Sequence, residues 1–402
     1  MDSLWTHGIH RRYPSLRGNI QVDVAIVGAG LSGIGAAYAL RNSGLRTTVL
    51  EARTVASGAS GRNAGFLLAG PAMPYSEAVR LLGSEQAKLL WSFTVENNES
   101  IATLIRKFGI HCGYIRRGSL SLAASESELG DLLRSHADLT QHGISCCLVS
   151  REFLPQPFDR LYRGGLYYPG NGELDPATFV SAVAEMASKT VMIFEESSVA
   201  YLEQAKAWRL ATSGGSVEAD IVLLCTNAFT SNLLPEVPIE SKRGQVLATS
   251  ALSTVRVPFP MYADNGFQYW RQTPEGRMIV GGWRNLEFDA ENSSQELLNP
   301  SIHMALDQFL TELVPGDETE VEYRWAGVMG FTPDRFPLVG SHPTKHGVYM
   351  AAGYSGHGVS MAFTCGARLA LIATGKTSSI PVSFLPSRLL LSPSQRAGES
   401  ET

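Results

Sequence analysis

The order of hydrophobic and polar residues predicts an α/β protein that begins with a strand, a glycine-rich turn, a helix and a second strand. Residues 22–27 are almost entirely apolar, which is typical of a buried strand. Small and apolar residues then predict a helix that begins at Leu31 and ends near Gly44. Residues 47–50 predict the second strand, which ends at Glu51.

Helical and strand patterns alternate along the rest of the chain. Helices are predicted at residues 76–108, 126–142 and 302–313, after the N-terminal signal Asp175-Pro176, and after Gly358. Strands are predicted at residues 113–123, 191–194, 199–202, 208–212, 221–225, 246–248, 266–271, 278–281 and 348–352. Residues 1–20, which include Trp5, are polar and irregular, and we expect them to lie along the surface.

The turn after the first strand has the chemistry of a dinucleotide-binding loop. Gly28 permits the tight turn, Gly30 lets the backbone approach a pyrophosphate, and Gly33 lets the helix pack on the strand. The helix N-terminus directs N–H groups and a partial positive charge toward phosphate oxygens. Glu51 follows Gly28 by 23 residues, where a carboxylate accepts hydrogen bonds from ribose hydroxyl groups. The alternative is a glycine-rich turn in some other α/β unit.

Composition narrows the possible partners. The chain has 402 residues, of which 44% are hydrophobic and 18% charged, and its net charge is −5. This balance is typical of a globular protein and gives no reason to expect nucleic acid or an anionic membrane as a partner. No segment resembles a signal peptide, and no apolar run has the length of a membrane span.

The five cysteines follow no metal-binding or disulfide pattern. Their number is odd and no CxxC is present, so the sequence predicts neither a disulfide framework nor a zinc site nor a redox pair. We expect no metal, and a reducing cytoplasm is the expected compartment.

With these residues in view, the chain resembles the FAD-dependent oxidoreductases of the D-amino-acid oxidase superfamily. The resemblance is to the branch that contains γ-glutamylputrescine oxidase, glycine oxidase and monomeric sarcosine oxidase. Four motifs carry it: Gly28–Gly33 with Glu51, Gly58–Gly65, Trp325–Gly327 with Thr332–Gly340, and Gly353–Gly358. Many dinucleotide-binding proteins share the first motif, whereas all four in this order are specific.

The resemblance implies an α/β fold with a Rossmann-like FAD-binding domain of the glutathione-reductase type. This domain is interleaved with an α+β substrate domain built on a mostly antiparallel sheet, with the ligand between the two lobes. We expect the FAD-binding domain at residues 1–88, 150–236 and 324–380, and the substrate domain at 89–149 and 237–323. Residues 381–402 are polar and rich in serine, and we expect a flexible tail there.

The resemblance also implies that FAD binds without a covalent link, because Gly327 stands where sarcosine oxidase carries the cysteine that joins its flavin. The residues expected to contact FAD are Gly28, Gly30, Leu31, Ser32, Gly33, Glu51, Ala52, Arg53, Ser60, Gly61, Arg62, Asn63, Ala64, Gly65, Phe66, Val199, Asn227, Gly330, Gly353, Ser355, Gly356, His357, Gly358 and Val359. Three of them have structural alternatives: a surface ion pair for Arg62, a helix cap for Asn227, and a role in the turn for His357.

The motifs also limit where the electrons come from. A second GxGxxG for a nicotinamide cofactor and the CxxC of disulfide reductases are absent, so we expect the substrate to supply the electrons. The resemblance makes that substrate an amine or an amino-acid-like molecule. The expected step moves a hydride from the carbon next to a neutral nitrogen to flavin N5 and gives an imine, which hydrolyses.

Departures from the relatives narrow the substrate. Glycine oxidase has an arginine for the substrate carboxylate where residues 328–331 stand here, and sarcosine oxidase has a lysine where Ser360 stands. Their absence argues against a small α-amino acid held in the usual way. Ile279 stands near the position of the oxygen-activating lysine of sarcosine oxidase, which leaves open whether O2 or another molecule accepts the electrons.

The expected substrate wall consists of Tyr262, Tyr269, Arg271, Trp283 and Met329. Tyr269 and Arg271 occupy alternate positions and therefore face one side of a strand. Together with His357 they are the candidate catalytic residues. The aromatic residues could instead be sheet core, and Arg271 could bind a distal carboxylate or be solvated at an edge.

Other functions are compatible with the same motifs. One is a dehydrogenase that passes electrons to a protein or a quinone, and another is an oxidative tailoring enzyme for a larger metabolite. A third is a subunit in which FAD is structural. We expect a monomer or a homodimer.

Overall fold

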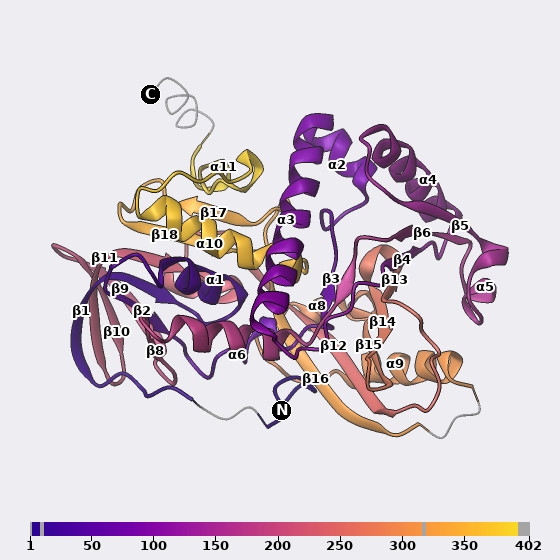
Figure 1. Ribbon diagram of the computed structural model, residues 1–402, viewed down its shortest axis with the longest axis horizontal. Coiled ribbons are helices and arrows are strands. Elements are labelled where there is room, and N and C mark those ends of the chain that lie inside the picture. Colours follow the sequence, from indigo (N-terminus) through magenta and orange to yellow (C-terminus); the bar gives the residue numbers. More distant parts are fainter. Residues whose placement is uncertain (1, 9–11, 316–318, 393–402) are drawn as a thin grey trace. The chain divides into compact units, whose positions relative to one another are not determined.

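The computed structural model describes residues 2–8, 12–315 and 319–392, and the chain divides into two compact units (Figure 1). Unit 1 contains Met1–His7, Arg62–Asp175 and Arg243–Val328. Unit 2 contains Gly8–Gly61, Pro176–Lys242 and Met329–Thr402. Each unit has its own sheet and its own buried hydrophobic core.

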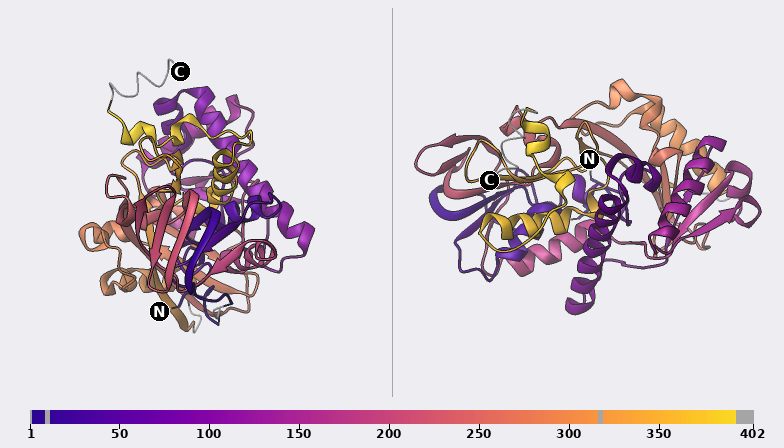
Figure 2. Two further views of the ribbon diagram at one scale, coloured as in Figure 1. Left: turned by 90° about the vertical axis from the view of Figure 1, so that its left-hand side faces the viewer. Right: turned by 90° about the horizontal axis from the view of Figure 1, so that it is seen from above.

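Unit 2 is built on a mainly parallel sheet with the strand order β17-β18-β11-β1-β2-β8. These strands are β1 (Gly18–Val27), β2 (Thr47–Leu50), β8 (Met192–Phe194), β11 (Gly215–Leu224), β17 (Leu338–Ser341) and β18 (Val348–Ala352). β1 runs parallel to β2 and β11, and β11 runs parallel to β18, so the carboxyl ends of these four strands share one edge. The hairpin of β9 (Val199–Gln204) and β10 (Trp208–Thr212) pairs with the first half of β11 (Figure 2).

The helices of unit 2 pack closely because glycines bring their backbones together. α1 (Leu31–Leu40) lies beside α10 (Ala362–Ala373) and α6 (Pro176–Ala187) (Figure 1). A Cβ on Gly366 would overlap the Ser32 carbonyl oxygen, and a Cβ on Gly35 would overlap the Phe363 carbonyl. The small residues of α1 therefore serve helix–helix contact as well as contact with the sheet.

The C-terminal segment of unit 2 is packed, in contrast to the flexible tail expected from residue 381. Phe384 is fully buried, and α11 (Ser387–Leu390) follows it. The Arg388 guanidinium bonds Asp334 at 2.7 Å and donates to the Phe336 carbonyl at 2.6 Å. The serine-rich composition concealed this anchor, because one buried aromatic and one ion pair suffice to hold the segment. Residues 393–402 of the expected tail lie outside the described residues.

Unit 1 is built on a sheet with the strand order β16-β12-β15-β14-β13-β4-β6-β5. These strands are β4 (Ser119–Leu122), β5 (Cys147–Ser150), β6 (Gly164–Tyr168), β12 (Glu240–Ala251), β13 (Met261–Ala263), β14 (Gln268–Gln272), β15 (Arg277–Gly282) and β16 (Val321–Phe331). The pairs β5–β6, β4–β6, β13–β14, β14–β15 and β12–β15 are antiparallel, whereas β4 and β13 run parallel. A short ribbon of β3 (Phe66–Leu67) and β7 (Gly172–Glu173) lies apart from this sheet.

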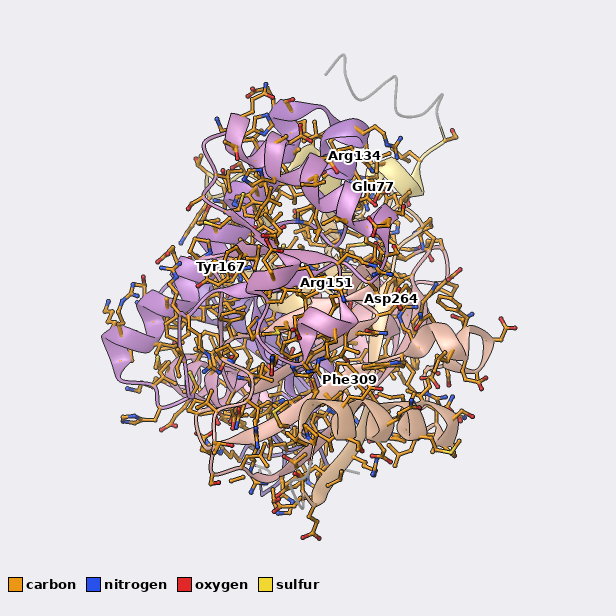
Figure 3. The ribbon with its side chains drawn as sticks, turned by 90° about the vertical axis from the view of Figure 1, so that its right-hand side faces the viewer. Glu77, Arg134, Arg151, Tyr167, Asp264 and Phe309 are labelled. Carbon is orange, nitrogen blue, oxygen red and sulfur yellow. The ribbon has the colours of Figure 1, made fainter. Side chains whose placement is uncertain are left out.

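One face of the unit 1 sheet forms the core with α9 (Pro300–Leu313), and Figure 3 shows Phe309 on that helix. Trp270 of β14 is fully buried, and its ring centre is 4.8 Å from that of Phe309. Near the other end of the sheet, α2 (Tyr75–Leu82), α3 (Ser84–Phe108) and α4 (Glu126–Gln141) form a second core. Two short helices, α5 (Phe158–Leu161) and α8 (Phe288–Glu291), complete the unit, as α7 (Thr230–Leu233) does in unit 2.

Several predicted elements differ in extent from the observed ones. The single helical pattern at 76–108 is two helices, because Gly83 adopts a φ of 79° between them. The strand predicted at 113–123 is limited to β4. Trp5 is not on the surface: its side chain is buried, with its indole N–H bonded to the Asn63 carbonyl at 2.7 Å.

The boundaries of the two compact units also differ from those expected for the two domains. Residues 62–88 were expected in the FAD-binding domain, but they belong to unit 1, since α2 packs on α3 and α4. Residues 150–175 also belong to unit 1, because β6 pairs with β4 and β5. Within the described ranges, no helix combines the length and apolar character that a membrane crossing requires.

His303 on α9 gives a testable pH dependence of stability. Burial, reinforced by the nearby Arg324 guanidinium, lowers the pKa of this imidazole to about 4. Between about pH 6.5 and pH 4 the unfolded chain therefore binds a proton that the folded chain does not, so acidification favours unfolding. We expect this residue to lower the free energy of unfolding by about 2 kcal/mol between pH 6.5 and pH 5.

Urea denaturation of the wild type and of His303→Gln at both pH values measures this effect. The fall in unfolding free energy should be smaller in the variant, because its side chain does not titrate in this range. An equal fall in both proteins would show that His303 is not the group responsible.

Candidate functional site

The carboxyl ends of β1, β2, β11 and β18 form the edge of unit 2 that carries the glycine-rich turn. The Gly28 N–H donates to the Leu50 carbonyl at 2.8 Å, and the Cys225 N–H donates to the Val27 carbonyl at 2.8 Å. These bonds continue the parallel pairing just past the strand ends. In open parallel sheets, ligands bind at this edge.

Glycine is required at two positions of this turn. Gly28 has a φ of 98°, and a Cβ there would lie 2.7 Å from the Cys225 carbonyl oxygen. A Cβ on Gly33 would overlap the Gly28 carbonyl oxygen. The first turn of α1 therefore packs directly on the end of β1, as a close approach to a pyrophosphate requires.

Glu51 is held beside the turn by backbone N–H groups. Its Oε2 accepts from the Ala29 N–H at 2.8 Å, and its Oε1 accepts from the Arg53 N–H at 2.9 Å. Burial raises the pKa of this carboxyl above its usual range. The Glu51 carbonyl accepts from the Ser197 N–H, two residues before Val199 at the start of β9.

The second glycine-rich motif begins at the N-terminus of α1. Ser60 lies in a short 3-10 turn, and its Oγ accepts from the Leu31 N–H at 2.9 Å. A Cβ on Gly30 would lie 2.7 Å from the same oxygen. Folding thus brings Ser60 to Gly30 and Leu31, which precede it by about thirty residues in the chain.

Asn227 connects three segments that are distant in sequence. It has a φ of 47°, and its Oδ1 accepts from the Gly353 N–H at 3.0 Å. A Cβ on Gly330 would lie 2.8 Å from the same Oδ1. Its described side-chain bonds therefore join the end of β11 to the loop after β18, rather than cap a helix.

The fourth motif is a loop that leads through a 3-10 turn into α10. The Tyr354 hydroxyl lies 2.7 Å from Ser32 Oγ, and the Ser355 N–H donates to the Gly330 carbonyl at 2.8 Å. His357 is largely shielded from solvent, and burial lowers its pKa to about 4. Its imidazole is therefore neutral at pH 7. Met329 lies beside this loop, with its Sδ 3.8 Å from the position of a Cβ on Gly356.

In unit 1, two of the predicted substrate residues lie side by side on the face of the sheet opposite α9. Tyr262 of β13 pairs with Tyr269 of β14, which pairs with Gly281 of β15. Burial raises the pKa of Tyr262 to about 12 and also raises that of Tyr269. The Phe66 ring meets the Tyr269 ring edge-on at 6.1 Å. This face is therefore aromatic, and its phenols are neutral at pH 7.

Arg271 does not offer its charge to solvent or to an edge, as the sequence allowed. Its side chain is 1% exposed and lies 3.3 Å from the Glu173 carboxylate. Its Nε donates to the Ala64 carbonyl at 2.6 Å and its Nη2 to the Leu174 carbonyl at 3.0 Å. All three nitrogens have protein partners, so a distal substrate carboxylate would have to displace one of them.

Trp283 belongs to the core rather than to a substrate wall. Its side chain is 9% exposed, and its ring centre is 4.9 Å from that of Phe309 on α9. The residue adopts a φ of 56°, which turns it toward the helix-covered face. Trp283 follows the end of β15 at Gly282, and its core position agrees with the alternative that the aromatic residues belong to the sheet core.

Arg62 is buried, so the surface ion pair considered for it is wrong. Its side chain is 6% exposed and lies 3.3 Å from Glu296. Its Nη1 donates to the Ala326 carbonyl at 3.2 Å, which joins the second motif to the third.

Comparison with known proteins identifies the family. Residues 23–371 match the model of the family described as DAO, FAD dependent oxidoreductase. The chain belongs to this family. The predicted fold class and the predicted cofactor, FAD, are thereby confirmed, as is the assignment to the oxidoreductases that act on amines and amino acids.

Individual relatives agree with this assignment. Gamma-glutamylputrescine oxidoreductase from Escherichia coli is 26% identical over 382 residues, covering 90% of this chain and 86% of its own length. Among solved structures, glycine oxidase from Geobacillus kaustophilus superposes with a TM-score of 0.78 at 22% identity, covering 92% of this chain and 99% of the other. L-proline dehydrogenase from P. horikoshii gives a TM-score of 0.75 at 21% identity, with 93% and 98% coverage. At these identities the two structures establish the fold alone.

The strand-end edge of unit 2 fits the adenosine diphosphate part of FAD. It offers a glycine-lined turn, a helix N-terminus and a carboxylate beside the turn, which are the groups that bind a pyrophosphate and a ribose. Only glycine leaves room for the backbone at Gly28 and Gly33, and Glu51 is already oriented by two N–H groups. These residues would hold FAD when it binds.

The sequence reasoning overlooked three residues beside the predicted ones. Glu173 is fully buried and pairs with Arg271, although no sequence pattern marks it. Trp5 bonds the second motif from a segment with no regular pattern. Lys242 places its ammonium group 5.2 Å from the centre of the Phe331 ring, which in turn lies beside Gly356. Of these three residues, only Trp5 had a sequence signal that could have indicated burial, because it is a single tryptophan in a polar segment.

Gly33→Ala tests the close contact at the turn. The added methyl group would overlap the Gly28 carbonyl, so we expect a loss of about 3 kcal/mol or more in unfolding free energy. We also expect the purified protein to carry less FAD, because the turn and the helix N-terminus move apart. Gly170→Ala is the matched control, since a Cβ there meets nothing within 4 Å. Equal stability and equal flavin content in both variants would contradict this account of the turn.

Proposed function

We propose that this protein oxidises a C–N bond of an amine or amino-acid-like substrate. The observation that carries the proposal is the family match over residues 23–371, together with the dinucleotide-binding edge of unit 2. When bound, FAD supplies the acceptor for a hydride, which carries two electrons. The substrate carbon loses the hydride while the nitrogen lone pair forms the C=N bond, which gives an iminium ion. The iminium ion releases its N–H proton to water, and water then hydrolyses the imine.

The candidate residues of each unit, taken separately, favour a neutral amine. His357 is neutral at pH 7, and the phenols of Tyr262 and Tyr269 keep their protons. None of these groups carries charge, so each contributes shape, an apolar surface and hydrogen bonds. A neutral nitrogen can release its lone pair without a base, which fits a site that lacks a charged catalytic residue. The proposed roles are therefore orientation of the substrate and exclusion of water.

The proposed substrate is larger or less acidic than a simple α-amino acid. The chain has residues 328–331 and Ser360 where relatives carry cations for a carboxylate. Ser360 is buried, and Met329 presents a flexible thioether beside the fourth motif. Arg271, the remaining candidate cation, is already paired with Glu173. These features support an extended amine bound mainly by apolar and aromatic contacts.

We propose that FAD is bound without a covalent link. Gly327 leaves no thiol at the position suggested by the resemblance, and it packs against Arg62, where a Cβ would lie 3.1 Å from the Arg62 Cβ. The five cysteines carry no disulfide, which supports a reducing compartment such as the cytoplasm.

Anaerobic mixing with a panel of amines tests the reaction. We expect at least one primary or secondary amine to bleach the visible flavin band, with release of the carbonyl product after hydrolysis. The alcohols of the same carbon skeletons are the control, because they lack the nitrogen lone pair. Bleaching by alcohols but not by amines would contradict the proposed substrate class. Bleaching by no candidate at all would contradict the proposal and favour a structural flavin.

A specific observation favours a dehydrogenase as the second candidate. Ile279 is fully buried on β15 beside Arg271, and it supplies no ammonium group at the position where the resemblance suggests an oxygen-activating lysine. We therefore expect slow reoxidation of the reduced protein in air and faster reoxidation by a quinone, followed by stopped-flow absorbance. Ile279→Lys should accelerate the reaction with oxygen. Rapid reoxidation of the wild type by air would instead identify an oxidase.

A further inference from the structure

Four consecutive carbonyl groups of the second glycine-rich motif are each held by a donor from a different part of unit 1. The Arg62 carbonyl accepts from the Trp325 indole at 2.9 Å, and the Asn63 carbonyl accepts from the Trp5 indole at 2.7 Å. The Ala64 carbonyl accepts from Arg271 Nε at 2.6 Å. The Gly65 carbonyl accepts from the Leu174 N–H at 2.9 Å. No regular strand pairing supplies the first three donors.

These bonds determine where the N–H groups of the segment point. In a trans peptide the N–H points away from the carbonyl of the same peptide unit. The Asn63 and Ala64 N–H groups therefore point away from the two indoles. The Gly65 N–H is held by Asn63 Oδ1 at 2.7 Å, within the segment itself. The two indole donors thus fix the orientation of two successive peptide planes.

The arginine in this set is built into a buried charge cluster. Glu173 Oε1 lies 3.3 Å from Arg271 and 2.7 Å from Arg117, and the Arg271 guanidinium lies 5.1 Å from the centre of the Trp5 ring. Gly65 allows this approach, since a Cβ there would lie 2.6 Å from Arg271 Nη2. Removing Arg271 and Glu173 from water is costly, so a well-packed apolar group would stabilise the fold as well or better. We therefore assign the cluster the role of holding Arg271 against the Ala64 carbonyl.

We infer that Trp5, Arg271 and Trp325 are positioning residues, which fix the backbone of residues 62–65 in the conformation that binds FAD. This inference rests on the proposed function in one respect, that the second motif contacts the cofactor. It assigns Arg271 to the cofactor rather than to the substrate. It also gives the N-terminal segment a role, through one indole N–H.

The test compares FAD release from purified holoenzymes of Trp5→Phe, Trp325→Phe and Arg271→Met with that from the wild type. Each tryptophan variant keeps one aromatic ring and loses the donor that holds a carbonyl. The smaller ring also leaves a cavity, and the control below has the same change of size. We expect release, followed by the rise in flavin fluorescence after dilution, to be faster by about fivefold in the tryptophan variants and about tenfold in Arg271→Met. We also expect the visible band of the bound flavin to shift in all three.

Trp208→Phe is the matched control, because the Trp208 indole also donates to a backbone carbonyl, that of His346, at 2.8 Å. This variant should lose stability to a similar extent but keep the wild-type release rate and flavin spectrum. Release from Trp5→Phe and Trp325→Phe that is no faster than from Trp208→Phe would overturn the inference, even if Arg271→Met fails to fold. A wild type that holds FAD but is reduced by no amine would contradict the proposed reaction and leave this inference standing.

Discussion

The contact that the rest of unit 2 depends on is the approach of α1 to the end of β1, backbone against backbone. Gly33 rests on the Gly28 carbonyl, and Gly366 of α10 rests on the Ser32 carbonyl one turn away. Any side chain at these positions would separate the helices from the sheet. The same contact leaves the helix N-terminus beside Glu51 and Ser60, so one steric constraint creates both the packing and the binding edge.

In unit 1, buried polar side chains hold an irregular segment by donating hydrogen bonds to its backbone carbonyls. Arg271, Trp5 and Trp325 each reach a carbonyl of residues 62–64, where no strand partner is available. A buried carbonyl without a partner is costly, so an irregular segment can be buried only where such donors exist. This explains why a charged residue is retained on a sheet face that is otherwise aromatic.

Much of the fold and part of the site could be predicted from the sequence. The glycine turn, Glu51 and the unit 2 strands were found because their signals are local: apolar runs, glycine spacing and a carboxylate at a set distance. The substrate residues were predicted less well. Trp283 turned out to be core and Arg271 a buried ion pair, since the direction of a side chain depends on bulges and partners that periodicity does not record.

The amino-acid sequence alone was enough to predict the family, the cofactor and the glycine turn between β1 and α1, because that turn requires backbone conformations that few residue types allow. Which charged side chains can reach a ligand became clear only from the folded chain. The sequence shows that Arg271, Arg62 and Glu173 are charged residues. It does not show that they are buried and that each is paired with another protein group. Electrostatic roles depend on neighbours that are distant in the chain, and those neighbours are assembled only by folding.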